Sequence, residues 1–363
     1  MKNAKTRNEQ MKRKYFKLLT EAKGFTDGTI EVIEKALWDY EEFSKEEDYA
    51  SFNEKKAREF KKWLAIKKHR NKTMSLSTQY TRLTKLIKFF EWLSQQNGYK
   101  SRISTDDINY LQMSKKEAKI ATSPKVDSLE YPTLEQVKHV CQVIDPKSEI
   151  DFRDKALISF TLLSGMRDQA IISLPLGCFD AEKLFINQDP SKGVGTKFSK
   201  TIPTFIFRFD EDLLKVVLYW HQYLINEKKF NLTDPLFPKT KVGQISDTNY
   251  AFQAEGVEPF YWKGAGSMRQ IFKERCEKAN LKYFSPHKFR HASIRLALDK
   301  CRSAEQIKAV SQNLGHESVS TTLLTYGRLA PDQIGKVIKN IDFNGEDLDS
   351  DKKLREIMKI MQK

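Results

Sequence analysis

Apolar residues recur at spacings of three and four along residues 25–115, which is the period of helices that share a core. The clearest case is the segment YTRLTKLIKFFEWL, whose apolar stripe consists of Tyr80, Leu83, Ile87, Phe90 and Leu93. Because such a stripe must be buried, the pattern predicts a small helical domain at this end of the chain.

Residues 55–72 predict a helix of a different kind. The segment KKAREFKKWLAIKKHRNK carries nine Lys or Arg and one acid, interleaved with Phe60, Trp63 and Leu64. We expect an apolar face toward a core and a cationic face outward. That outer face suits a phosphate backbone, and it equally suits water, so a single basic helix does not decide between the two.

Two segments lack a core-forming pattern. Residues 1–24 are rich in Lys and Arg, and we expect their first twenty residues to be mobile or ordered only on a partner. The segment KKEAKIATSPKVDSLEY contains Ser, Pro and charges without periodicity, which is typical of a linker. A new helix then begins at Thr133, with Gln136 completing a capping box.

The part after this linker alternates between helical and β patterns. RDKALISFTLLSGMRDQAIISLPLGCF reads as helix, turn and helix, and LFINQD and KTIPTFIFRF read as strands joined by a turn rich in Gly and Lys. A helix at 210–230, a loop and at least three more helices follow. The sequence therefore predicts a mainly α fold with a small antiparallel β-sheet.

Composition adds a hint about the partner. The 363 residues carry a formal net charge of +15, with 39% hydrophobic and 31% charged residues, as in a folded protein. A surplus of this size favours a polyanion, most often nucleic acid. The four cysteines are widely spaced, which argues against a zinc ribbon or a disulfide scaffold and indicates a reducing compartment. We expect no secretory signal and no membrane span.

The residues best suited to chemistry gather toward the carboxyl end. SPHKFRHASIRLAL places His287 and Arg290 three residues apart, so both can address one ligand from one helix face. His287 and His291 also have the spacing of a metal pair, but no H-E-x-x-H motif and no obvious third ligand accompany them, so we expect no metal. Taken singly, each histidine fits a half-buried structural side chain equally well.

A second group fits the same substrate. In LLSGMRDQA, Gly165 permits a tight turn that aims Arg167 outward. Two arginines, a lysine-bearing hairpin, two histidines and a tyrosine suit a phosphodiester, since each guanidinium can hold two non-bridging oxygens. Tyrosine can attack a phosphorus that is polarised in this way.

The order S-G-M-R, a Lys-rich hairpin, H-K-F-R-H, L-G-H and then Y resembles the tyrosine recombinase (phage integrase) family. The resemblance implies a helical core-binding domain and a mixed α/β catalytic domain. Combined with the predicted linker, the resemblance gives five parts. They are a basic N-terminal segment at 1–24, a core-binding domain at 25–115, a linker at 116–130, a catalytic domain at 131–340 and a docking tail at 341–363.

The resemblance also implies site residues. The matching positions are Arg167, His287, Arg290, His316 and the nucleophile Tyr326. The family's lysine closes the first strand of the hairpin, which favours Lys192, while Lys197 and Lys200 remain alternatives. No cofactor or metal is implied.

Two departures from the family pattern stand out. Ala170 lies where many members carry an acid, so Asp168 or another group must orient the first arginine, or that bond is missing. The spacing from His316 to Tyr326 is ten rather than nine residues, and no other tyrosine follows His316. We expect the Ser- and Thr-rich stretch between them to form an adaptable loop.

The implied function is that of a site-specific recombinase or integrase, which cleaves and rejoins double-stranded DNA through a 3′-phosphotyrosine as a homotetramer, for a mobile genetic element. A cytoplasmic, nucleoid-associated bacterial protein is then expected. Two alternatives remain: relaxation of DNA in the manner of a type IB topoisomerase, or a DNA-binding accessory factor without catalysis. The tail, DKKLREIMKIMQK, docks either on its own domain or on a neighbouring protomer.

Overall fold

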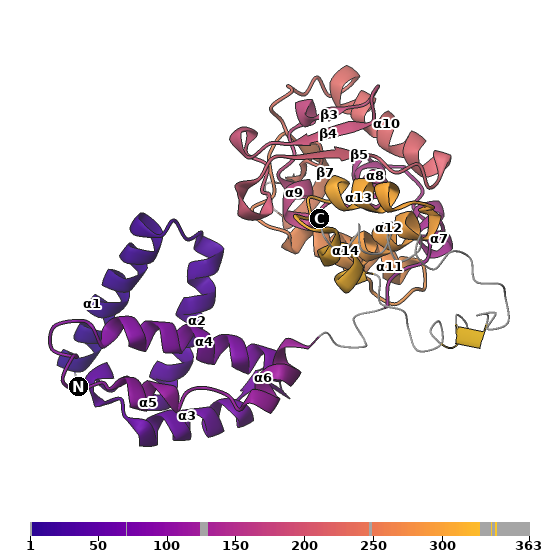
Figure 1. The fold of residues 1–363 in the computed structure, drawn as a ribbon. Helices are drawn as coiled ribbons and strands as arrows, with labels where there is room; N and C mark the ends of the chain where they lie inside the picture. Colours follow the sequence, from indigo (N-terminus) through magenta and orange to yellow (C-terminus); the bar gives the residue numbers. More distant parts are fainter. Residues whose placement is uncertain are drawn as a thin grey trace. The chain divides into compact units, whose positions relative to one another are not determined.

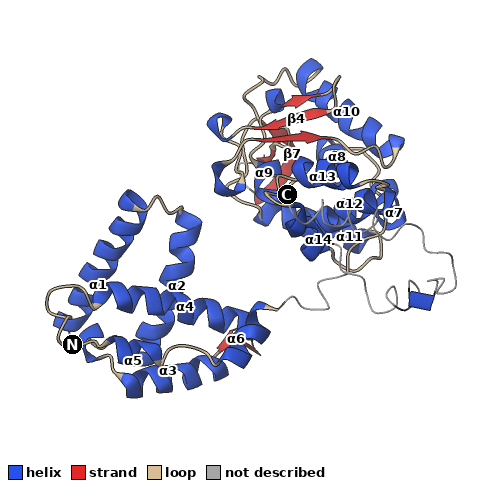
Figure 2. Cartoon of the chain, viewed as in Figure 1, coloured by secondary structure: helices blue, strands red, loops and turns tan. Residues whose placement is uncertain are grey.

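The chain divides into two compact units, Met1–Lys125 and Val126–Lys363. The computed structural model describes residues 2–69, 71–123, 130–246, 249–326, 335 and 338–339. Both units are mainly helical, with small antiparallel β-sheets, as the sequence predicts (Figures 1 and 2). The expected docking tail, 341–363, lies outside the described residues.

The first unit is built from helices and one short hairpin. Its elements are α1 (Lys2–Lys17), the π-helical turn η1 (Leu18–Ala22), α2 (Asp27–Ser44), the 3₁₀ turn η2 (Tyr49–Ser51), α3 (Glu54–Ile66), β1 (Lys68–His69), β2 (Lys72–Thr73), α4 (Leu76–Leu93), α5 (Thr105–Asn109) and α6 (Lys115–Thr122).

Aromatic side chains fill the core of the first unit. Phe90 of α4 stacks on Phe52 with ring centroids 4.0 Å apart, and Tyr40 of α2 meets Phe90 edge-on at 5.1 Å. Leu83 and Leu93 of the predicted stripe are buried beside them. Each aromatic pair adds about 0.5–1.5 kcal/mol beyond the area that it buries. The prediction for α4 is therefore confirmed.

Helix α3 has the two faces that the sequence predicts. Phe60 and Leu64 are buried in the core, while Lys55, Arg58 and Lys62 are exposed. The helix is shorter than predicted, because it ends at residue 66.

The remainder of the predicted basic helix is the hairpin β1–β2. Lys68 pairs with Thr73, and His69 pairs with Lys72. Asn71 lies in the connecting turn with a φ of 62°. Asparagine tolerates this left-handed backbone better than most residues, so the local sequence ends the helix and reverses the chain.

The amino-terminal segment differs from the expectation of a mobile tail. It forms α1 and η1, with Tyr15 of α1 and Leu19 of η1 buried in the core of the unit. Lys12 pairs with Glu41 at 2.9 Å, and Asn8 accepts a hydrogen bond from the backbone of Tyr49 at 3.1 Å. The expectation gave weight to the charge and overlooked two apolar residues one helical turn apart.

The expected linker is partly helical. Ser114 and Glu117 form a reciprocal capping box that starts α6, and Ala121 of that helix is buried. The division between the two units follows at residues 125 and 126. A serine followed three residues later by glutamate is a known helix start, so the local sequence accounts for this helix.

The second unit contains the remaining described elements. They are α7 (Leu134–Val143), α8 (Glu149–Ser164), α9 (Asp168–Ile172), η4 (Leu176–Cys178), β3 (Phe179–Asp180), β4 (Phe185–Gln188), η5 (Pro190–Lys192), η6 (Lys197–Ser199), β5 (Ile202–Phe205), α10 (Glu211–Asn226), β6 (Lys239–Ser246), β7 (Asn249–Glu258), α11 (Gly266–Lys278), α12 (Pro286–Lys300), α13 (Ala304–Asn313) and α14 (Val319–Tyr326).

Helix α8 is the central element of this unit. Every residue from 156 to 164 is buried, and α7, α10 and α12 pack against the helix. A helix that is buried on all sides lies in the middle of a core, which explains why the segment shows no amphipathic stripe. The predicted capping box at Thr133 and Gln136 is confirmed at the start of α7.

Two antiparallel sheets lie in this unit. The predicted pairing of the two β segments is confirmed: Gln188 lies opposite Ile202, and Phe185 lies opposite Phe205, with β3 completing the order β3–β4–β5. The hairpin β6–β7 corrects the expectation of a loop after the helix at 210–230. Two glycines and the register shifts along β6 interrupt the alternation that reveals a strand in a sequence.

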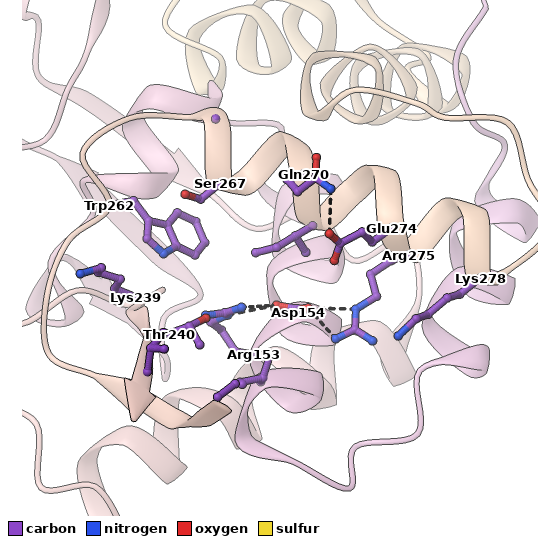
Figure 3. Close-up of a pocket in the computed structure, with 15 residues that line it drawn as sticks. Arg153, Asp154, Lys239, Thr240, Trp262, Ser267, Gln270, Glu274, Arg275 and Lys278 are labelled. Atoms are coloured by element: carbon purple, nitrogen blue, oxygen red, sulfur yellow. Dashed lines mark hydrogen bonds and ion pairs between the residues drawn. The ribbon is translucent and has the colours of Figure 1, made fainter. Parts of the chain in front are cut away.

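A buried cluster of charges joins three elements of the second unit (Figure 3). Asp154 of α8 accepts hydrogen bonds from Arg153 at 2.7 and 3.0 Å and from Arg275 of α11 at 2.6 and 2.9 Å. Arg153 also donates to the carbonyl of Pro238 and to the hydroxyl of Thr240 in β6. The side chains of Arg153 and Asp154 are only 2% and 4% exposed. The carboxylate is thus saturated by two guanidinium groups.

Replacing this carboxylate tests its structural weight. We expect Asp154→Ala to destabilise the second unit by about 3–5 kcal/mol, because Arg153 would stay buried without its carboxylate and Arg275 would be left with Asp151. Calorimetry of the full chain should show its transition at a lower temperature. Asp145, in an exposed pair with Lys147, is the control, and Asp145→Ala should cause almost no change. If the two substitutions lower the transition temperature equally, the buried carboxylate of Asp154 does not have the structural role described here.

Candidate active site

Arg290 joins three segments that are far apart in the sequence. It lies in the second turn of α12 and is 2% exposed. Its guanidinium donates to the carbonyl of Gly165, to the carbonyl of Leu314 at 3.1 Å, and to Nε2 of His316 at 3.1 Å. A buried guanidinium needs acceptors for its N–H groups, so these bonds fix both turns against α12.

Both turns depend on glycine. Gly165 ends α8 with a φ of 60°, and a Cβ at this position would lie 2.9 Å from Oγ of Ser293. Gly315 has a φ of 69°, and its Cβ would lie 2.5 Å from a methyl group of Ile202. The backbone conformation and the lack of space both require glycine here. The residues that follow, Arg167 and His316, are positioned by these turns.

Arg167 lies just before α9 and is half-buried. Its charge contributes to the lowered pKa of both His287 and His316, so it acts on the same site as Arg290. Asp168 does not match the orienting role suggested by the sequence: within the described chain, its carboxylate bonds to Arg269 at 2.8 Å and to the next backbone amide. Ala170 is buried in the core of the unit.

His316 is held through both ring nitrogens. Nε2 faces Arg290, and Nδ1 lies 2.7 Å from the hydroxyl of Thr322. Burial, followed by the charges of Arg290 and Arg167, lowers the pKa of His316 to about 4. The ring is therefore neutral at pH 7.

His287 and His291 bond to each other on α12. Their Nε2 atoms are 3.1 Å apart, so one ring donates and the other accepts. Burial, followed by the charge of His287, lowers the pKa of His291 to about 4, and burial, followed by Arg290, lowers the pKa of His287. Among the described residues, no group of three or more His, Cys, Asp or Glu could hold a metal ion.

The three candidate lysines lie in different places. Lys192 is exposed in the 3₁₀ turn after β4, four residues beyond the end of the strand, where its charge acts on Cys178. Lys200 instead forms an ion pair with Glu317, the residue after His316, and Lys197 also lowers the pKa of Glu317. In this DNA-free structure, Lys197 and Lys200 therefore lie closer to the histidine turn than Lys192 does. The position at the end of the strand had favoured Lys192 instead.

A polar network ties the histidine turn to the three-stranded sheet. Asn313 at the end of α13 accepts from the backbone N–H of Phe205 at 2.6 Å and donates to its carbonyl at 3.0 Å, as a neighbouring strand would. The hydroxyl of Thr204 donates to the carbonyl of Asn313, and Gln188 donates to that hydroxyl. The sheet and its hairpin are thereby fixed relative to residue 316.

The segment between His316 and Tyr326 is helical rather than an adaptable loop. Glu317 and Ser318 lie outside α14, and the hydroxyl of Ser318 accepts from the amide of Ser320 at the helix start. Thr322 satisfies its hydroxyl with His316 and Ser311, which explains how a threonine suits this helix. The continuously described backbone ends at Tyr326, and the position of the Tyr326 hydroxyl lies outside the described part of the chain.

The sequence did not identify Thr322, Ser311 or Asn313 as site residues. Their hydroxyl and amide groups become informative only when the turn at Gly315 brings α13 and α14 together around His316. The periodicity of hydrophobic residues along the sequence carries no information about such contacts across a turn.

Comparison with known proteins extends these observations. Residues 131–333 match the model of the phage integrase family. The chain is similar to tyrosine recombinase XerD of Pasteurella multocida (strain Pm70), with 23% identity over 260 residues, or 69% of this chain and 71% of that protein. It is also similar to the ICEBs1 integrase of Bacillus subtilis (strain 168), with 24% identity over 72% of this chain and 64% of that protein.

The fold has counterparts among solved structures. A lambda integrase tetramer bound to a Holliday junction matches with a TM-score of 0.58 and 12% identity, over 86% of this chain and 78% of that one. No helix in the described residues has the length and apolar character needed to cross a membrane. The match to the family model covers more than half of the sequence, and the chain belongs to the phage integrase family of tyrosine recombinases.

Proposed function

We propose that this protein is a site-specific DNA recombinase, or integrase, that cuts and rejoins strands through a 3′-phosphotyrosine at Tyr326. The observation that carries the proposal is the convergence of Arg290, Arg167 and His316 at two glycine turns. Two guanidinium groups beside neutral imidazoles form a positively charged site, which suits the scissile phosphate of DNA. Membership of the phage integrase family supports the same chemistry.

The proposed steps conserve atoms and charge. The phenolic oxygen of Tyr326 attacks phosphorus, with His287 assisting the loss of its proton, and the bond to O5′ breaks. A lysine of the hairpin protonates the leaving O5′, while Arg167 and Arg290 neutralise the non-bridging oxygens. Because the phosphotyrosine retains the energy of the phosphodiester, another 5′-hydroxyl can reverse the reaction without ATP.

We also propose roles for the two units. The first unit would be the core-binding domain, whose exposed Lys55, Arg58 and Lys62 on α3 suit a phosphate backbone. The second unit would be the catalytic domain. The solved lambda integrase tetramer on a Holliday junction supports a tetramer here too. The protein would act in the cytoplasm of a bacterium on nucleoid DNA, and it would serve a mobile genetic element.

Trapping a covalent adduct tests the nucleophile. On nicked suicide DNA carrying the recombination site, the unaltered protein should form a protein–DNA adduct that resists denaturation, and Tyr326→Phe should form none, because phenylalanine has no hydroxyl to attack. Electrophoresis under denaturing conditions measures the yield. Tyr283→Phe, which removes the hydroxyl of a tyrosine 42% exposed, is the control and should retain the yield. An adduct with Tyr326→Phe would contradict the proposal, and relaxation of supercoiled DNA lacking a site would favour a topoisomerase.

A sulfur leaving group identifies the lysine. One of the three lysines should act as the general acid that protonates the leaving O5′. We expect its replacement by alanine to slow cleavage of ordinary DNA about 10²-fold or more, because the leaving O5′ loses its proton donor. A substrate with sulfur at the 5′-bridging position needs no such proton, so its rate should stay near that of the unaltered protein. Comparing Lys192→Ala, Lys197→Ala and Lys200→Ala on both substrates makes each lysine the control for the others. If each of the three variants cleaves ordinary DNA as fast as it cleaves the sulfur substrate, none of the three hairpin lysines is the general acid.

Assembly tests the place of the tail. A protein lacking residues 346–363 should bind DNA but fail to form tetramers, if the tail docks on a neighbouring protomer. Sedimentation of the complexes with DNA measures the change. Tetramers of unaltered stability would show that the tail does not hold the protomers together.

A further inference from the structure

The ring of His316 sits at one end of a chain of hydroxyl groups. Nδ1 lies 2.7 Å from Oγ1 of Thr322, and this hydroxyl donates to Oγ of Ser311 at 2.9 Å. Ser311 in turn donates to the carbonyl of Ser318 at 3.5 Å. Thr322 is 0% exposed and Ser311 is 1% exposed, so water does not compete for these bonds.

The bonding partners decide which nitrogen carries the proton. A guanidinium has five N–H donors and no acceptor, so the contact at 3.1 Å between Nη2 of Arg290 and Nε2 of His316 requires a lone pair on Nε2. The ring proton therefore sits on Nδ1, and it is donated to Thr322. The donor direction is then the same along the whole chain, from His316 through Thr322 and Ser311 to a main-chain oxygen.

The opposite neutral tautomer conflicts with this arrangement. A proton on Nε2 would point at the guanidinium of Arg290, donor against donor. It would also require Thr322 to donate to Nδ1, so that Ser311 would have to donate to Thr322 instead and give up its bond to the carbonyl of Ser318. The hydroxyl chain and the arginine thus select the same tautomer from opposite sides of the ring.

We propose that Thr322 and Ser311 are positioning residues of the active site, which fix the tautomer and ring orientation of His316 so that Nε2 faces the scissile phosphate beside Arg290. This inference rests on the proposed function. It also accounts for how His316 could become a donor. If the ring gains a proton from solvent when the phosphate enters, Nδ1–H keeps its bond to Thr322, and the new Nε2–H points at a phosphate oxygen. The hydroxyl chain need not rearrange.

The spacing agrees with this role. Thr322 lies on α14, the helix whose described backbone ends at Tyr326, and Ser311 lies on α13, before the turn that carries His316. The two hydroxyls therefore connect the helices on either side of the histidine turn. A loss of either hydroxyl should release the ring without removing any group that touches the DNA.

Nitrogen NMR measures the tautomer directly in the DNA-free, full-length protein. Long-range correlations of the His316 ring, assigned by their absence in His316→Ala, should show a protonated Nδ1 and a bare Nε2. Thr322→Val keeps the shape of the side chain and removes the hydroxyl, so we expect averaged shifts from mixed tautomers. Thr322→Ser should restore the pattern. Thr321→Val, at the exposed neighbouring position, should leave it unchanged.

Adduct formation on suicide DNA measures the effect on the reaction. Thr322→Val should slow it roughly ten- to a hundredfold, the cost of a misplaced catalytic group, and Thr322→Ser should recover the rate. In a His316→Ala background, Thr322→Val should add no further loss, since it acts through that ring.

The inference is overturned if Thr322→Val leaves the ring shifts unchanged, or if it slows the reaction equally with and without His316. If the unaltered protein forms no adduct at all, the proposed function fails. The NMR comparison then still decides whether Thr322 sets the tautomer of His316.

Discussion

The buried guanidinium of Arg290 is the constraint around which the second unit is organised. A permanent charge that is 2% exposed must find acceptors inside the protein, and it finds them on Gly165, Leu314 and His316. These acceptors belong to two turns that lie about 150 residues apart in sequence, and each turn needs a glycine to adopt its backbone. The packing of α8, α12 and α13 is therefore inseparable from the placement of one side chain.

The same constraint sets the electrostatics of the site. Gly165, Leu314 and His316 are neutral acceptors, so their hydrogen bonds satisfy N–H donors without adding a negative charge. Burial, followed by the charge of Arg290, lowers the pKa of His316 and of His287, and Arg167 acts in the same direction. Neutral imidazoles beside guanidinium groups suit an anion that brings its own negative charge.

The sequence was sufficient where local chemistry decides the structure. The capping box at Thr133, the stripe along α4 and the pairing of β4 with β5 follow from periodicity and turn chemistry, and all three are confirmed. The resemblance to tyrosine recombinases selected Arg167 and Arg290, which the fold brings to one site. Their catalytic roles remain predictions that the adduct and leaving-group experiments address.

The sequence was insufficient where contacts between distant segments decide. α1 is ordered because Tyr15 packs on aromatic rings of α4 and because polar side chains of α1 meet partners on α2 and on the segment just after it, which charge content alone does not reveal. The hairpin β6–β7 escapes a pattern search because bulges and glycines break its alternation. Lys200 pairs with Glu317 across 117 residues, and Thr322 reaches His316 around a turn, so neither contact leaves a periodic trace.

One property of the clamp on Arg290 bears on how such a site evolves. Two of its acceptors, at residues 165 and 314, are peptide oxygens, which every amino acid supplies. Apart from the glycines that shape the turns, the surrounding side chains can change by mutation without removing these acceptors. A scaffold anchored in this way can diverge until little of its sequence is shared while its backbone is preserved, as in the lambda integrase structure, which shares this fold at 12% identity.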